Sequence, residues 1–264
     1  MTDAKLIAEL LELAKRIGRE AGELLQKRPA AFEVTSKSTA IDVVTQMDSQ
    51  SENHIVSEIL KARPGDGIIG EEGSERTSKS GITWVIDPLD GTVNYLYGLP
   101  GWNVSIAAKD SDGVVVGVVV APTINSTWSA SRGGGAFLNG QAIACNDEVE
   151  LNRALIGTGF AYDVDARPAQ LAQLSELLIR IRDIRRNGAA AVDLCFVATG
   201  ALDGYFEKGL QEWDLAAGGL IATEAGAKVT TAAGTIIAAA PALHATLSFR
   251  LAQERAHARF TLRR

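Results

Sequence analysis

The sequence of 264 residues predicts a layered α/β fold with mixed sheets. Helical periodicity opens the chain over residues 3–27. Two β-rich runs follow at residues 102–109 and 114–120, and the segment Asp110-Ser-Asp-Gly113 between them carries a hairpin signal. A helical pattern returns late in the chain, over residues 213–225. Antiparallel strands followed by helices are typical of layers that share a core.

Periodicity and chain-breaking residues place the other elements of the first half. Pro29 ends the first helix, whose apolar face is formed by Leu6, Leu10, Leu13, Ile17, Ala21 and Leu24. We expect a second helix over residues 47–62, an apolar strand ending at Gly70, and a third antiparallel strand over residues 123–131. The glycines at 133–135 are expected to form a turn, because no Gly-Lys-Ser/Thr follows them as in a phosphate-binding loop.

The second half is expected to alternate strands and helices. The predicted strands cover residues 154–158, 203–207 and 235–240. The predicted helices cover residues 168–181, 192–199, 213–225 (with Gly226 just beyond its C-terminus) and the tail from residue 243. No linker divides the chain, so residues 1–264 are treated as one unit with a seam near residue 150. The halves are an α+β part, 1–150, and an α/β part, 151–264.

Composition excludes some classes of function. The net charge of −6 argues against a nucleic-acid-binding surface. The chain has no apolar run of about 18 residues and no signal-peptide pattern, so we expect a cytoplasmic protein without membrane contact. Cys145 and Cys195 are too few for a disulfide framework, and we expect buried thiols.

The most informative stretch covers residues 82–98. A buried strand over residues 83–86 is expected to end at Asp87-Pro88, and Asp90-Gly91-Thr92 supplies turn residues immediately after it. Two carboxylates on one tight turn can point at one spot, which suits hard divalent cations. Main-chain N–H groups of Gly91 or Thr92 could meet a phosphate oxygen. Alone, the pattern fits an Asp-Gly turn whose carboxylates cap loops better than it fits a metal site.

Three segments together resemble the inositol monophosphatase family. They are Gly70-Glu71-Glu72, residues 84–95 from Trp84 to Tyr95, and residues 213–218 from Trp213 to Gly218, which match in order and spacing. The resemblance runs from about Lys37 to the region of Ala239, with a shorter segment between residues 226 and 236. It implies a five-layer α-β-α-β-α sandwich with largely antiparallel sheets. It also implies a lithium-sensitive, Mg²⁺-dependent phosphomonoesterase that forms homodimers.

The resemblance assigns roles to particular residues. Two or three Mg²⁺ ions, with Mn²⁺ as a possible substitute, would be held by Glu71, Asp87, the Leu89 carbonyl, Asp90 and Asp214. Catalysis would depend on Asp48, Glu71, Asp87 and Thr92, with Asp48 and Thr92 orienting the attacking water. The substrate would contact Asp90, Gly91, Thr92, Ala190, Glu207 and Asp214. Lys37 would lie beside the metals.

Plainer structural roles stay open for three of these residues. Asp48 also fits a carboxylate in the first turn of a helix, Asp214 fits a helix N-cap, and Glu207 fits an ordinary strand end. The histidines are not near a motif, so an imidazole-bound metal such as zinc is not expected; they are His54, His244 and His257.

The leading expectation is hydrolysis of inositol 1-phosphate. The alternatives within the same chemistry are histidinol phosphate, fructose 1,6-bisphosphate, NADP and 3′-phosphoadenosine phosphates, with specificity expected in the loops at 158–165 and 185–191. A regulatory protein that keeps the fold, or a protein merely stabilised by Ca²⁺ or Mg²⁺, is the alternative of another class. No nucleophile elbow or Walker loop supports a different hydrolase.

Overall fold

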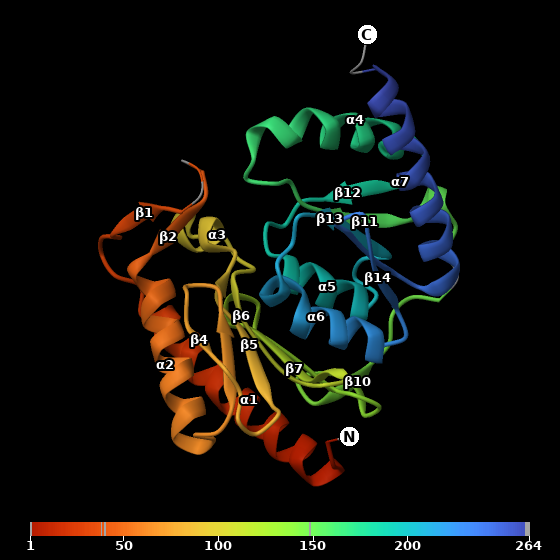
Figure 1. The fold of residues 1–264 in the computed structure, drawn as a ribbon. Helices are drawn as coiled ribbons and strands as arrows, with labels where there is room; N and C mark the ends of the chain where they lie inside the picture. The colour runs from red at the N-terminus through yellow and green to blue at the C-terminus, as the bar shows by residue number, and fades with distance from the viewer. Residues whose placement is uncertain (1, 38, 40, 148, 262–264) are drawn as a thin grey trace.

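The computed structural model describes residues 2–37, 39, 41–147 and 149–261, with side chains described as far as residue 252. Its elements form five layers, as predicted (Figure 1). The outer helices α1 (Ala4–Gln26) and α2 (Gln46–Ala62) cover the first sheet, and α5 (Ala190–Ala198) and α6 (Glu212–Glu224) lie between the two sheets. Helices α4 (Arg167–Leu178) and α7 (Pro241–Thr261) cover the second sheet.

The first sheet has eight strands in the order β10-β9-β8-β7-β6-β5-β3-β4. Only β3 and β5 pair in parallel; the other pairs in this sheet are antiparallel. The strands are β3 (Gly67–Gly70), β4 (Glu75–Arg76), β5 (Thr83–Asp90), β6 (Asn103–Asp110), β7 (Gly113–Ala121), β8 (Ser126–Ser131), β9 (Gly135–Leu138) and β10 (Gln141–Ile143).

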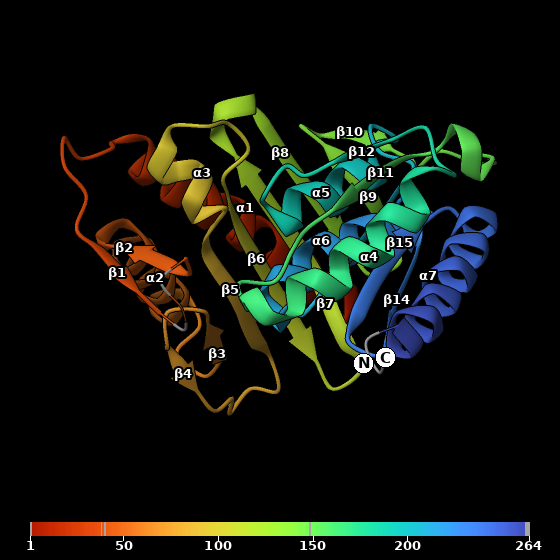
Figure 2. The ribbon, with the colours of Figure 1, turned by 90° about the horizontal axis from the view of Figure 1, so that it is seen from above.

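The second sheet has five strands in the order β12-β11-β13-β15-β14. They are β11 (Leu155–Thr158), β12 (Asp183–Arg185), β13 (Gly204–Lys208), β14 (Lys228–Ala232) and β15 (Thr235–Ala239). A separate pair, β1 (Val34–Ser36) and β2 (Val43–Thr45), lies beside α2 at the end of the molecule far from α7 (Figure 2).

Apolar side chains form one core on each side of the middle layer and one within it. Helix α1 buries Leu10 and Ile17 of its expected face against the first sheet, and α2 buries Ile55 there. The middle layer is packed more closely, because its helices are rich in alanine and glycine. Small side chains let the helices approach both sheets, so residues from each half of the chain meet there. The division into two halves near residue 150 stays a prediction.

Some predicted boundaries are wrong. Strand β5 does not end at Ile86 but continues to Asp90, with a shift of register between Asp87 and Asp90 where it pairs with β6. This irregularity is a bulge-like feature that local sequence does not reveal. The strand expected over residues 123–131 begins only at Ser126, because Pro122–Ile124 forms a short 3-10 turn.

Several short elements were not predicted from the sequence. They are helix α3 (Thr92–Tyr97) and strands β1, β2, β4, β9, β10, β12 and β14. Cys195 is buried as expected, but Cys145 is only partly buried, and both are free thiols. Among the described residues, no helix has the length and apolar character that crossing a membrane requires.

Gly117 on β7 provides a test of the close packing in the middle layer. A Cβ atom at this position would lie 2.8 Å from the Ala217 carbonyl oxygen and 2.9 Å from its Cα atom on α6. Both are backbone atoms, so Gly117→Ala is expected to lower the free energy of unfolding by about 1–3 kcal/mol, measured by urea denaturation. The control is Gly65→Ala, whose Cβ would find only ordinary contact at 3.6 Å. Equal stability of the two variants would contradict the packing argument.

Candidate active site

Glu71 and Asp87 come together because β3 and β5 run in parallel. The register pairs Gly70 with Ile86, so the next residue of each strand lies at the same edge of the sheet. The Glu71 N–H donates to the Ile86 carbonyl at 3.1 Å, which continues the pairing by one residue. Asp87 is only 2% exposed. The parallel pair therefore brings two carboxylates from separate segments to one edge of the sheet, where Asp87 is buried and Glu71 is partly exposed.

Asp90 connects β5 to the start of α5. Its Oδ2 accepts hydrogen bonds from Asn103 Nδ2 and from the Ala191 main-chain N–H, both at 2.9 Å. Ala191 lies in the first turn of α5, whose N-cap residue, Ala189, has no side chain able to cap it. Asp90 thus satisfies a free N–H at the start of a helix 101 residues away.

Asp214 lies at the start of α6, but it is not the N-cap residue. Gln211 is the N-cap, and Asp214 occupies position N3 of a capping box, where its Oδ2 accepts from the Gln211 N–H at 2.6 Å. The N-cap interpretation of Asp214 is therefore wrong by three residues. Ser105 Oγ on β6 donates to the Trp213 carbonyl at 3.3 Å, which fixes the start of α6 beside β5 and β6.

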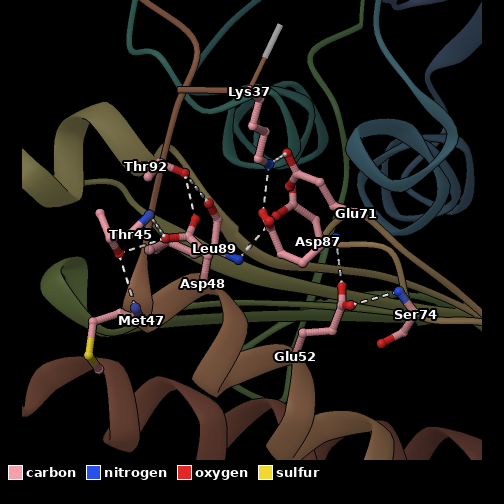
Figure 3. A network of polar contacts seen from close by, with 11 residues as sticks. Lys37, Thr45, Met47, Asp48, Glu52, Glu71, Ser74, Asp87, Leu89 and Thr92 are labelled. Carbon is pink, nitrogen blue, oxygen red and sulfur yellow. Dashed lines mark hydrogen bonds and ion pairs between the residues drawn. The ribbon is translucent and has the colours of Figure 1, made fainter. Parts of the chain in front are cut away.

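Asp48 and Thr92 contact each other, as the resemblance implies. Thr92 Oγ1 lies 2.9 Å from Asp48 Oδ1 and 3.0 Å from the Leu89 carbonyl (Figure 3). Asp48 is also at N3 of α2, where its Oδ2 accepts from the Thr45 N–H and hydroxyl in a capping box. The helix-start interpretation and the functional one are thus compatible, because each uses a different carboxylate oxygen.

A cavity of about 410 Å³ collects most of the remaining predicted residues. Its lining includes Glu71, Asp90, Ala190, Glu207 and Asp214, together with Lys37 and both loops in which specificity is expected. Asp48, Asp87, Leu89, Gly91 and Thr92 are not part of this lining. A larger cavity of about 730 Å³, lined by Arg153 and Arg182 among others, contains none of the predicted residues.

The buried carboxylates raise one another's pKa values. Burial and then the charges of Glu71 and Asp90 hold the pKa of Asp87 well above its usual range. Burial raises the pKa of Asp90 to about 6, although hydrogen bonds from Asn103 and Ala191 oppose the shift. Burial and the charge of Asp90 raise the pKa of Asp214 to about 8. Concentrated negative charge without a compensating cation is therefore unfavourable here.

Glu207 on β13 also lines this cavity. The Tyr205 hydroxyl donates to Glu207 Oε2 at 2.5 Å; both side chains point to the same face because they are two residues apart on one strand. Gly159 has no side chain, and a Cβ atom at its position would overlap the Glu207 carboxylate. Burial raises the pKa of Glu207.

Lys37, one of the lysines that line this cavity, forms ion pairs with Glu71 and Glu72. Lys37 Nζ lies 2.8 Å from Glu71 Oε1 and 2.6 Å from Glu72 Oε1 (Figure 3). Burial lowers the pKa of Lys37, but the charges and hydrogen bonds of these two glutamates outweigh it and raise that pKa overall. The Lys37 ammonium group is thus already ion-paired with Glu71, one of the predicted metal ligands.

The donor set fits a hard divalent cation, although it is not arranged as a finished coordination shell. No group of three or more His, Cys, Asp or Glu side chains in the described part of the chain surrounds a single point closely enough to hold a metal. The donors that converge here are carboxylates and a main-chain carbonyl, which are the oxygen ligands that Mg²⁺ prefers. Burial and the neighbouring carboxylates raise the pKa values of Asp87 and Asp214, and a cation bound among them would offset this cost of their negative charge.

The described histidines lie away from this site. His54 Nε2 is 3.4 Å from Glu20, and His244 Nε2 is 2.9 Å from Thr230 Oγ1. The side chain of His257 lies outside the described residues. Three supporting residues were missed from the sequence: Asn103, Tyr205 and Glu52. For Glu52 a signal existed, because it shares the buried face of α2 with Asp48 and Ile55.

Comparisons with known proteins agree over nearly the whole chain. The model of the inositol monophosphatase family matches residues 6–262. A Mycobacterium bovis protein named inositol-1-monophosphatase is 40% identical over 263 residues, covering 89% of this chain and 91% of that protein. The Nus factor SuhB of Haemophilus influenzae is 42% identical over 225 residues, covering 83% and 84%. The crystal structure of the extragenic suppressor protein SuhB from Bartonella henselae has a TM-score of 0.88 at 34% identity, covering 92% of this chain and 98% of that one.

The raised pKa values predict how the stability of the metal-free protein depends on pH. The carboxyls of Asp90 and Asp214 hold protons more tightly in the folded chain than in the unfolded one, where their pKa is about 4. Their contribution is therefore complete below about pH 4 and is lost as the pH rises through about 6 and about 8.

We expect the melting temperature in EDTA to fall between about pH 5 and pH 8, measured by calorimetry, and Asp214→Asn to reduce this slope. Saturating Mg²⁺ should flatten the profile, because a bound cation takes the place of the protons. A melting temperature in EDTA that does not vary over this range would contradict the electrostatic description of the site.

Proposed function

The chain belongs to the inositol monophosphatase family, and we propose that it hydrolyses inositol 1-phosphate to inositol and phosphate in a Mg²⁺-dependent reaction. The observation that carries this proposal is the convergence of carboxylates from β3, β5 and α6 beside one cavity. Clustered carboxylates are costly unless a cation binds them, and a phosphate ester needs cations near its own charge.

Magnesium would be held by Glu71, Asp87, the Leu89 carbonyl, Asp90 and Asp214, as two or three ions. When bound, the ions neutralise these ligands, stabilise negative charge on the phosphate and increase the acidity of water. The chain's own groups have the remaining tasks. Thr92 and Asp48 are hydrogen-bonded at 2.9 Å, so the hydroxyl can accept a proton from the attacking water while donating its own to the carboxylate. The N–H groups of Gly91 and Thr92 would bind a phosphate oxygen.

Specificity would come from the opposite wall of the cavity. Glu207 and Ala190 line it together with the loops that contain Tyr162 and Arg186. A carboxylate next to a neutral small side chain suits a polyol, whose hydroxyl groups donate hydrogen bonds. The competing esters remain histidinol phosphate, fructose 1,6-bisphosphate, NADP and 3′-phosphoadenosine phosphates, which would need different contacts in these loops.

A regulatory role is the second candidate, because several relatives are named Nus factor SuhB. In that case a partner macromolecule, rather than turnover, would explain the role of the chain in the cell. Complementation of a deletion strain separates the two candidates. Asp87→Asn, expected to lose nearly all turnover, would restore growth under the regulatory role and fail to restore it under the enzymatic one.

We also propose a cytoplasmic homodimer. Large apolar side chains lie exposed on and next to α4, which supports a subunit contact there: Val164 (58% exposed), Leu171 (55%) and Ile179 (76%). Light scattering during gel filtration should give about twice the mass of the 27.9 kDa chain. Ile179→Glu should shift this mass toward the monomer, because it places a charge in the contact.

Phosphate release with a panel of esters tests the substrate. Inositol 1-phosphate is expected to have the highest kcat/KM in the presence of Mg²⁺, with activity abolished by EDTA and inhibited by Li⁺. A higher kcat/KM for one of the four competing esters would keep the metal-dependent chemistry and replace the substrate. No release from any ester by folded protein would contradict the enzymatic proposal.

Asp87→Asn tests the assignment of the metal ligands. The amide keeps the shape of the side chain but removes the charge, so kcat/KM should fall by at least about 10²- to 10³-fold. The matched control is Asp112→Asn. This exposed aspartate lies in the turn between β6 and β7 and outside the cavity lining, so its replacement should leave kcat/KM unchanged. Turnover of Asp87→Asn close to that of the wild type would refute the assignment.

A further inference from the structure

Glu52 is a buried carboxylate that neither lines the cavity nor belongs to the predicted ligands. It lies on α2, one turn after Asp48, and is 3% exposed. Both of its oxygens accept main-chain hydrogen bonds from another segment: Oε2 from the Glu72 N–H at 2.9 Å and Oε1 from the Ser74 N–H at 3.0 Å (Figure 3). An acidic side chain buried in this way has its hydrogen-bonding capacity directed at one turn of the backbone.

That turn is the one that carries Glu71. It joins β3 to β4 and is closed by the Gly70 N–H, which donates to the Ser74 carbonyl at 2.8 Å. On its other side, the Glu71 N–H donates to Ile86 on β5 at 3.1 Å. Glu71 is therefore fixed on one side by β5, and the backbone that follows it is fixed by Glu52 at Glu72 and Ser74.

Gly70 shows how closely Glu52 approaches the turn. A Cβ atom at this position would overlap the Glu52 carboxylate, and both of its oxygens lie within 3.0 Å of the Cβ position. Gly70 has an ordinary backbone conformation, so its glycine is not required by φ. The missing side chain is explained by the room that the carboxylate needs.

We propose that Glu52 is a positioning residue for metal binding: its carboxylate holds the β3–β4 turn so that Glu71 faces Asp87. This inference rests on the proposed function, in which Glu71 is a metal ligand. Glu52 itself touches neither the substrate nor the metal. Groups that orient metal ligands typically contribute about 10- to 100-fold to metal affinity.

The chemistry of the contact explains why a carboxylate is needed. Two N–H groups converge on Glu52, and each needs an acceptor. Glutamine has nearly the same shape but only one acceptor oxygen, so its NH₂ group would face an N–H donor. Glu52→Gln therefore breaks one of the two bonds and leaves the turn free to move, while the volume of the buried side chain is kept.

Mn²⁺ titration by calorimetry tests the proposal with a readout that does not require turnover. Glu52→Gln is expected to weaken Mn²⁺ binding by about 10- to 100-fold. In kinetics, the Mg²⁺ concentration for half-maximal rate should rise by the same factor, and kcat at saturating Mg²⁺ should recover most of its wild-type value. The control is Glu58→Gln on the same helix, which loses an ion pair with Arg16 at 2.9 Å but is remote from the turn; its Mn²⁺ affinity should not change.

Gly70→Ala is a second variant that leaves Glu52 in place. Its methyl group displaces the carboxylate, so the same loss of Mn²⁺ affinity is expected even where Glu52→Gln folds poorly. A folded Glu52→Gln or Gly70→Ala protein that binds Mn²⁺ as tightly as the wild type would overturn the positioning role alone. A wild-type protein that binds no divalent ion would instead overturn the proposed function, and the positioning role with it.

Discussion

Repulsion among buried carboxylates is the constraint on which the organisation of this site depends. Glu71, Asp87 and Asp214 come from three different segments, and the packing of those segments buries Asp87 and leaves Glu71 and Asp214 only partly exposed. The pKa of Asp87 is accordingly held well above its usual range, by burial first and by neighbouring charge second. In this structure the Lys37 ammonium group neutralises part of that negative charge, because it forms ion pairs with Glu71 and Glu72. A bound divalent ion would neutralise the negative charge of these carboxylates more completely.

Hydrogen bonds at this site also connect the first sheet to the helices of the middle layer. Asp90 satisfies the start of α5, and Ser105 on β6 holds the start of α6 through the Trp213 carbonyl. Both helices lie between the two sheets, so each of these hydrogen bonds joins the first sheet to the middle layer at the site. Residues that would bind metal therefore also have structural bonds. Loss of one of them affects both the chemistry and the relation between the layers.

Periodicity and motif spacing predicted the long helices, the antiparallel strands and the layered architecture, because these depend on local patterns. Sequence did not predict that β5 continues to Asp90, since its irregular register is set by pairing with β6. The N-cap of α6 was predicted three residues too late, at Asp214. Gln211, a weak capping residue, serves as the N-cap instead. Glu52 was not singled out, because a lone glutamate in a helix is usually solvated and its partners are 20 and 22 residues away.

A crystal structure of the protein soaked with Mn²⁺, with anomalous scattering data, tests the central claim most directly. The account predicts anomalous peaks bounded by Glu71, Asp87, Asp90 and Asp214, with the Lys37 ammonium displaced from Glu71. Mn²⁺ is a suitable probe because it shares the oxygen ligands of Mg²⁺. Peaks elsewhere, or Lys37 still bound to Glu71 with no peak among these carboxylates, would contradict it.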